Sequence, residues 1–301
     1  MTTSRDSFAE FREVLEAIGF RPSSSLGQNF LLDPTLHRVI AQAAGAGPGD
    51  VVLEIGVGLG FLTRELAAVA GTVVGVEIDK RLFEVATREL AGFPNVALVR
   101  ADALSGPGGT IAPEVVEAVR TRLLPGGRLL VVANLPYSVS GPLLAELCCL
   151  ETLPARILVL VQKELGQRLA AAHGTGEYGS LAALCQACYR VRILRDVPPQ
   201  VFRPRPKVVS ALVELVQRED SGALREPAAA RRSLARFLRT LFQQRRKVLR
   251  TTLPRACEAV GRAVPAHAID LGLRAEALSP DALVGLWAGG AGPTQEGRHE
   301  G

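Results

Sequence analysis

The sequence predicts an α/β protein: a doubly wound, largely parallel sheet followed by a small α-helical domain. Three observations support this fold class. Short apolar runs alternate with helical patterns from residue 51 onward, and the first of these runs ends in a glycine-rich loop. After a change of composition near residues 218–227, the spacing of the apolar residues is helical only.

Residues 1–49 are expected to be mainly helical. A short amphipathic helix is predicted by the near-helical spacing of four apolar residues, Phe8, Phe11, Leu15 and Ile18. A serine-rich stretch follows. Asp33 and Pro34 then have the form of a helix start, an N-cap followed by proline at the first helical position.

The first predicted strand, residues 51–55, runs into a loop, residues 56–60, with glycine at every second position. A glycine-rich βα turn lets the backbone approach a ligand at the helix N-terminus, so Gly56 and Gly58 are candidates for ligand contact. The dinucleotide fingerprint requires a further glycine where this chain has Phe61. The loop therefore argues against a pyrophosphate cofactor.

The next two predicted strands lead to carboxylates. Residues 72–76 lead to Glu77, which is placed to accept hydrogen bonds from both ribose hydroxyls of a nucleoside. That feature suits NAD and S-adenosylmethionine equally. Residues 96–100 lead to Asp102, which is suited either to accept from an adenine amino group or to cap a helix.

The tetrapeptide Asn134-Leu135-Pro136-Tyr137 follows the apolar run 129–133. The side-chain oxygen of Asn134 can accept a hydrogen bond from the exocyclic amino group of a base, and the ring of Tyr137 can stack on the base. Alone, the tetrapeptide also suits an ordinary turn. Together, the four strand ends form one crevice at the carboxyl edge of the sheet, where such folds bind ligands.

Later strands are expected at residues 156–161, 189–195 and 208–216. The last two have too little chain between them for a full helix, so they predict an antiparallel closing hairpin. The doubly wound domain is therefore expected to span residues 50–217.

Residues 226–290 are expected to form a small basic helical domain. Its first helix has an apolar stripe that we assign to the core, formed by Leu234, Phe237, Leu238, Leu241 and Phe242. Ser279 and Pro280 have the form of another helix start. Residues 291–301, rich in glycine and polar residues, predict a disordered tail.

Charge and cysteine usage narrow the class of protein. The net charge is +5, and residues 225–262 carry eleven Arg or Lys against two Glu. Because the guanidinium fork pairs with phosphate oxygens, this block favours nucleic acid over a merely solvated helix face. No apolar run approaches the ~18 residues of a membrane span, and the N-terminus does not have the form of a signal or transit peptide. Five cysteines, an odd number, suggest reduced thiols in a cytoplasm, and the lone Cys185-x-x-Cys188 pair is not expected to bind metal.

Several stretches together resemble the KsgA (RsmA) family of bacterial 16S rRNA adenine N6-dimethyltransferases. The resemblance extends over nearly the whole chain except the tail. Besides the strand-end motifs, it rests on Leu26-Gly27-Gln28-Asn29-Phe30-Leu31, Val161-Gln162-Lys163-Glu164, Glu177-Tyr178-Gly179, the segment 201–211, and Gln244-Arg245-Arg246-Lys247.

The resemblance implies a class I methyltransferase fold with S-adenosylmethionine as cofactor. The implied product is N6,N6-dimethyladenosine at two adjacent adenines in a terminal hairpin loop of 16S rRNA, within the small ribosomal subunit or its precursor. Asn134 and the backbone carbonyl of Leu135 would accept hydrogen bonds from the adenine amino group. Tyr137 would stack on the flipped base, with Phe202 on its other face or in the pocket wall. No histidine lies near these motifs in the sequence, in keeping with a reaction that needs neither a strong general base nor a metal.

Further residues are carried over or proposed by charge. The resemblance assigns cofactor contacts to Asn29, Leu31, Gly56, Gly58, Glu77, Asp102 and Asn134, with the N-terminal segment as a cofactor lid. The candidates for RNA phosphate contacts are Arg203, Arg205, Lys207, Arg245, Arg246 and Lys247. The chain departs from the family pattern at residues 22–26, Pro-Ser-Ser-Ser-Leu, where basic residues and an aromatic are usual; we assign this segment no RNA contact.

Three alternatives stay open. The erythromycin-resistance methylases modify 23S rRNA in the large subunit and usually have isoleucine at the position of Leu135 and serine at that of Gly27. A non-catalytic assembly or transcription factor could use the same scaffold, although retention of four residues favours catalysis: Gly56, Glu77, Asp102 and Asn134. A nicotinamide oxidoreductase is disfavoured by Phe61. A cytoplasmic monomer is the expected form.

Overall fold

The computed structural model describes residues 13–16, 19–20, 29–265 and 270–289. The predicted amphipathic helix, the serine-rich segment and the tail lie wholly or largely outside these residues. The chain forms two compact units, one of residues 1–147, 152–166 and 192–216, the other of residues 148–151, 167–191 and 217–301. Residues 167–191 therefore belong to the second unit, whereas the sequence predicts that the doubly wound domain continues to residue 217.

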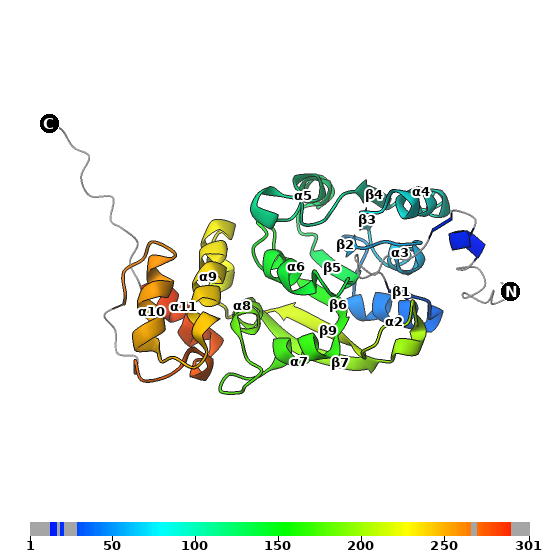
Figure 1. The fold of residues 1–301 in the computed structure, drawn as a ribbon. Coiled ribbons are helices and arrows are strands. Elements are labelled where there is room, and N and C mark those ends of the chain that lie inside the picture. Colours follow the sequence, from blue (N-terminus) through cyan, green and yellow to red (C-terminus); the bar gives the residue numbers. More distant parts are fainter. Residues whose placement is uncertain (1–12, 17–18, 21–28, 266–269, 290–301) are drawn as a thin grey trace, which may run out of the picture. The chain divides into compact units, whose positions relative to one another are not determined.

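The main sheet has seven strands, and its topology is that of the predicted class (Figure 1). The strands are β2 (Val51–Ile55), β3 (Thr72–Glu77), β4 (Val96–Arg100), β5 (Leu129–Asn134), β6 (Arg156–Gln162), β7 (Tyr189–Val197) and β9 (Ser210–Gln217). Their order is β4-β3-β2-β5-β6-β9-β7, parallel from β4 to β6, with β9 antiparallel to β6. This arrangement confirms the doubly wound sheet with an antiparallel closing strand. A second, small sheet pairs β1 (Phe30–Leu31) with β8 (Phe202–Arg203).

Helices lie on both sides of the main sheet (Figure 1). In the first unit they are α2 (Pro34–Ala44), α3 (Phe61–Ala67), α4 (Lys80–Glu89), α5 (Pro113–Arg120) and α6 (Ser140–Leu147). The remaining helices of the chain are α7 (Lys163–Ala170), α8 (Ser180–Cys188), α9 (Ala228–Leu241), α10 (Leu249–Glu258) and α11 (Pro280–Gly289). Alternate strand residues such as Val52, Leu130 and Leu158 pack with α2 and α3 in one core cluster. The residues between them are equally buried on the other face. Burial on both faces explains why these strands read as continuous apolar runs.

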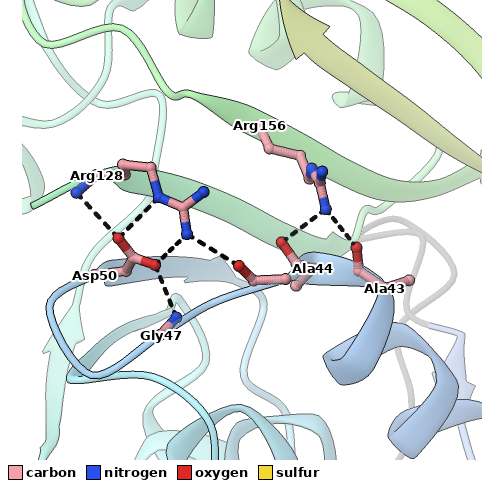
Figure 2. A network of polar contacts seen from close by, with 7 residues as sticks. Ala43, Ala44, Gly47, Asp50, Arg128 and Arg156 are labelled. Carbon is pink, nitrogen blue, oxygen red and sulfur yellow. Dashed lines mark hydrogen bonds and ion pairs between the residues drawn. The ribbon is translucent and has the colours of Figure 1, made fainter.

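Helix α2 is anchored at both ends. The Asp33 carboxylate accepts from the amides of Thr35 and Leu36 at 2.8 and 3.1 Å, which confirms the predicted helix start. At the other end, the Arg156 guanidinium donates to the carbonyl oxygens of Ala43 and Ala44 (Figure 2). A cation is favourable there because the last carbonyls of a helix carry partial negative charge.

Asp50 ties the same region to the sheet (Figure 2). Its carboxylate accepts from the Arg128 guanidinium, with Nε at 3.0 Å, and from the Gly47 amide at 2.7 Å. The hydrogen bond from the Arg128 side chain lowers the pKa of Asp50. Because Asp50 and Arg128 precede β2 and β5, the network lies at the edge of the sheet opposite the ligand-binding edge and is structural.

The second unit is helical and centred on α9. The five residues of its predicted apolar stripe are all buried. Arg231 is also buried there, because its guanidinium donates to the carbonyl oxygens of Cys148 and Leu150. At the start of α11, Ser279 Oγ accepts from the Ala282 amide at 3.2 Å, which confirms that helix start.

All five cysteines are buried, and none of them forms a disulfide. In the described part of the chain, no three histidine, cysteine or carboxylate side chains gather as a metal ion would require. Of the helices within the described ranges, none is long and apolar enough to cross a membrane.

Candidate active site

A cavity of about 260 Å³ opens at the carboxyl ends of β2, β3, β4 and β5. Since β2 lies between β3 and β5, the cavity is at the point where the strand order reverses, the usual ligand site of open α/β sheets. Eight of the residues predicted from the sequence line it: Asn29, Leu31, Gly56, Glu77, Asp102, Asn134, Leu135 and Tyr137.

The glycine loop brings the backbone close beneath this cavity. Gly56 and Gly58 have positive φ angles of 84° and 59°. A Cβ atom on Gly58 would lie 3.3 Å from the Phe30 ring, a tight contact that leaves little room for a side chain. Gly58 is not among the lining residues. Its amide instead donates to Glu77 Oε2 at 2.8 Å, so the structure gives it an indirect place at the site.

Glu77 is held as a fixed acceptor at the end of β3. Its Oε1 accepts from the Asp79 amide at 2.9 Å, while Oε2 is bound by Gly58. Burial raises the pKa of Glu77, and these amide hydrogen bonds oppose the rise. Asp102, by contrast, is exposed, and its Oδ1 accepts from the Leu104 amide at 2.9 Å. Asp102 thus forms a local turn instead of capping a helix.

Asn134 is oriented by the segment that precedes α2. It is the last residue of β5, and its Nδ2 donates to the carbonyl oxygen of Asn29 at 2.8 Å. With the amino group used in this way, Oδ1 is the atom that can accept from a ligand. Leu135 is 1% exposed, and its amide donates to the Leu160 carbonyl at 3.1 Å, which fixes the start of the turn.

The rest of the turn places an aromatic ring at the cavity. Ser140 Oγ donates to the Pro136 carbonyl oxygen at 2.9 Å and closes the turn. Tyr137 is partly buried, and its hydroxyl lies 2.7 Å from Ser210 Oγ. Burial raises the pKa of Tyr137. The ring therefore carries a neutral hydroxyl at neutral pH and is anchored at its far end.

A buried carboxyl group that is not among the residues predicted from the sequence also lines the cavity. Glu54 is 1% exposed and lies on the same face of β2 as Val52, which packs with α2 and α3. Among the described residues, its Oε2 has no hydrogen-bond partner. Burial raises the pKa of Glu54 from 4.5 to about 8, and the charge of Glu77 contributes to the rise. A glutamate within an apolar strand was the available signal in the sequence.

His37 corrects the expectation that no histidine lies near the motifs. It lines the cavity, is 5% exposed, and stacks on Phe61 with ring centroids 6.0 Å apart. Burial lowers its pKa to about 4, so the ring is neutral and a weak base at neutral pH. The sequence could not place it, because α2 reaches the end of β2 only through tertiary packing.

Phe202 is not among the residues that line the cavity. Its side chain is 1% exposed and packs in the core cluster with α2, because β8 pairs with β1 and brings Phe202 opposite Leu31. The structure therefore gives no support to the predicted stacking of Phe202 on a base.

Three of the candidate phosphate contacts lie at the end of β8 and in the loop that follows it, before β9. Arg205 and Lys207 are exposed in this loop. Arg203 is partly buried, and its guanidinium donates to the carbonyl oxygens of Gln200 and Phe202 at 2.9 and 2.8 Å. Two of the three cations are therefore presented to solvent on this loop.

The other three candidates precede α10 in the second unit. Arg246 and Lys247 are exposed. The Arg245 guanidinium donates to the carbonyl oxygen of Tyr178 at 3.0 Å and pairs with Glu276 at 3.3 Å. Arg245 thus ties two segments of this unit together, a structural use of a side chain predicted to contact RNA.

The sequence is similar to those of known ribosomal RNA methyltransferases. The family model described as ribosomal RNA adenine dimethylase matches residues 19–285. A protein of Magnetococcus marinus named ribosomal RNA small subunit methyltransferase A is 38% identical over 90% of this chain and 93% of its own length. A protein of the same name from Deinococcus radiodurans is 40% identical over 93% of this chain and 88% of its own length.

Solved structures show the same fold. A dimethyladenosine transferase from Plasmodium falciparum matches with a TM-score of 0.64 at 23% identity, over 84% of this chain and 94% of its own. The 23S rRNA methyltransferase ErmE matches with a TM-score of 0.58 at 26% identity, over 87% of this chain and 99% of its own. The family match spans both units and the cavity residues, and identities near 40% favour the small-subunit relatives over ErmE. The chain belongs to the ribosomal RNA adenine dimethylase family, whose members are S-adenosylmethionine-dependent enzymes.

Proposed function

We propose that this chain dimethylates N6 of two adjacent adenines in a terminal hairpin loop of 16S rRNA, as a step in the biogenesis of the small ribosomal subunit. The observation that carries the proposal is that Asn134, Leu135 and Tyr137 lie in one cavity with Gly56 and Glu77. The small-subunit relatives support this choice of RNA. We also propose that the enzyme acts as a cytoplasmic monomer.

The residues that line the cavity suit S-adenosylmethionine in their charge and hydrogen-bonding groups. In our assignment, Glu77 holds the ribose hydroxyls and Asp102 the adenine amino group. Gly56, Asn29 and Leu31 surround the methionine part. The cofactor carries sulfonium and ammonium cations. The buried carboxyl of Glu54, whose Oε2 has no hydrogen-bond partner among the described residues, favours a cationic ligand because it gains a counter-charge. When bound, the cofactor supplies an electrophilic methyl group.

The chain must then activate a poor nucleophile. The N6 lone pair of adenine is conjugated with the ring, so the amino nitrogen reacts weakly. Hydrogen bonds from both N6 hydrogens to Asn134 Oδ1 and the Leu135 carbonyl oxygen favour a tetrahedral nitrogen with a localised lone pair. Their strength grows as positive charge develops on N6, which stabilises the transition state more than the ground state. The proton can leave after methyl transfer, and Tyr137 holds the base by stacking.

The test is methyl transfer from labelled S-adenosylmethionine to under-methylated small subunits, with large subunits and free nucleosides in parallel, followed by nucleoside analysis. Dimethyladenosine from small subunits alone is the expected result. Label in large subunits would support the activity named for ErmE. Tight subunit binding without label would support a non-catalytic assembly factor.

A further inference from the structure

The hydroxyl of Tyr137, in the turn after β5, is hydrogen-bonded to a buried serine of β9. Its hydroxyl is 2.7 Å from Ser210 Oγ, across 73 positions of sequence. Ser210 is 0% exposed and is the first residue of β9. It is not among the residues that line the cavity, so it reaches the site only through Tyr137.

The position of Ser210 is itself fixed by the sheet. Ser210 lies opposite Gln162 in the antiparallel pairing of β9 with β6. One residue earlier, the Val209 carbonyl oxygen accepts from the Lys163 amide at 3.0 Å. Because these backbone hydrogen bonds fix the position of Ser210, its hydroxyl can hold a side chain on a neighbouring turn in place.

The two ends of Tyr137 are therefore fixed by different parts of the fold. The backbone end belongs to the turn closed by Ser140 and Pro136, and the phenol end is bound by Ser210. A tyrosine held only at its backbone can change χ1 among staggered rotamers. A stacking surface, however, must keep one plane if it is to present a base to a methyl donor in reactive geometry.

We propose that Ser210 is a positioning residue, whose hydroxyl fixes the plane of the Tyr137 ring as the platform on which the target adenine stacks. The inference deepens the proposed function and rests on it for the identity of the base. It assigns a role in the reaction to Ser210 of β9, although the side chain of Ser210 does not line the cavity.

A double-mutant cycle tests the pairing. Ser210→Ala and Tyr137→Phe each remove one hydroxyl while keeping the strand and the aromatic ring. We expect each to lower kcat on small subunits about tenfold, the value of one well-placed hydrogen bond, and to change KM for subunits and Kd for S-adenosylmethionine less than about twofold. The double variant should lose no more than either single variant, because both substitutions break the same interaction. Ser221→Ala, which removes another buried serine hydroxyl in the second unit, is the matched control and should keep wild-type kcat.

A spectroscopic measurement tests the orientation without catalysis. The chain has three tyrosines, so 3-fluorotyrosine labelling gives three ¹⁹F resonances. Ser210→Ala should shift or broaden the resonance of Tyr137, which Tyr137→Phe identifies by its loss. The resonances of the buried Tyr178 and Tyr189 serve as internal references.

The outcomes separate the inference from the proposed function. An unchanged Tyr137 resonance in Ser210→Ala overturns the positioning role, as do additive losses of kcat or a rise in KM at constant kcat. If wild-type protein methylates no RNA, the proposed function fails, and the ¹⁹F spectrum still decides whether Ser210 fixes the ring. If Ser210→Ala does not fold, Tyr137→Phe carries the same expectation for kcat.

Discussion

Glu54 should make folding stability depend on pH in a way that one substitution removes. Its side chain is 1% exposed, and burial raises its pKa from 4.5 to about 8. The unfolded chain therefore ionises this carboxyl between those two pH values while the folded protein keeps it protonated. Because the ionised form is available only on unfolding, stability falls as the pH rises through this window.

The magnitude follows from the two pKa values. At about 1.36 kcal/mol for each pKa unit, a rise from 4.5 to about 8 corresponds to a loss of about 5 kcal/mol once the pH exceeds the folded value. Glu54→Gln keeps the shape of the protonated side chain and cannot ionise. Below pH 4.5 the variant and the wild type should be about equally stable, and above pH 8 the variant should be more stable by up to ~5 kcal/mol.

The assay is urea unfolding of both proteins across this pH range, without cofactor. Glu84→Gln, at an exposed position of α4, is the control and should show no such divergence. A constant difference between wild type and Glu54→Gln across the window would refute the reasoning, because the carboxyl would then ionise equally easily in both states.

Binding of the cofactor should also reveal the ionisation of Glu54. A cation placed in a cavity lined by Glu54 favours the carboxylate and lowers its pKa. Binding of S-adenosylmethionine near neutral pH should therefore release close to one proton from the wild type and none from Glu54→Gln. Calorimetry in buffers of different ionisation enthalpy measures this release, and equal proton release by both proteins would contradict the prediction.

Three further predictions concern other contacts. Asn134→Ala should lower methyl transfer by about 10²- to 10³-fold while subunit binding in a filter assay stays nearly unchanged; near-normal methylation would exclude the assigned mechanism. Asp50→Asn should lower the free energy of unfolding by about 2 kcal/mol at neutral pH, and this loss should vanish as the pH falls through the lowered pKa of Asp50. Urea unfolding at several pH values measures the loss. A pH-independent loss would argue against the charged pair with Arg128. Arg245→Ala should lower Tm with little change in RNA affinity. The double variant Arg246→Ala, Lys247→Ala should leave Tm unchanged and reduce the slope of log binding constant against log salt concentration by about 1.4 to 1.8. The reverse pattern would contradict the structural role of Arg245.

Local signals in the sequence were sufficient for much of the fold. Apolar runs buried on both faces marked the parallel strands, and the Asp33-Pro34 and Ser279-Pro280 pairs marked helix starts that the structure confirms. These features depend on neighbouring residues, because caps and strand runs satisfy backbone groups and bury side chains locally. The same logic placed glycine, acidic and amide residues at successive strand ends, which meet at one edge because the strands are parallel.

Other features required the tertiary structure. His37 and Ser210 reach the site from α2 and β9, and their positions depend on which elements pack together. Phe202 and Arg245 were predicted to contact substrate, but tertiary contacts occupy both. The pairing of β8 with β1 buries Phe202, and the Arg245 guanidinium donates to the carbonyl oxygen of Tyr178. The sequence by itself determined which residue types stand at the ends of the strands. Only tertiary packing decided which side chains were left to face a ligand, because burial and hydrogen-bond partners come from residues distant in the chain.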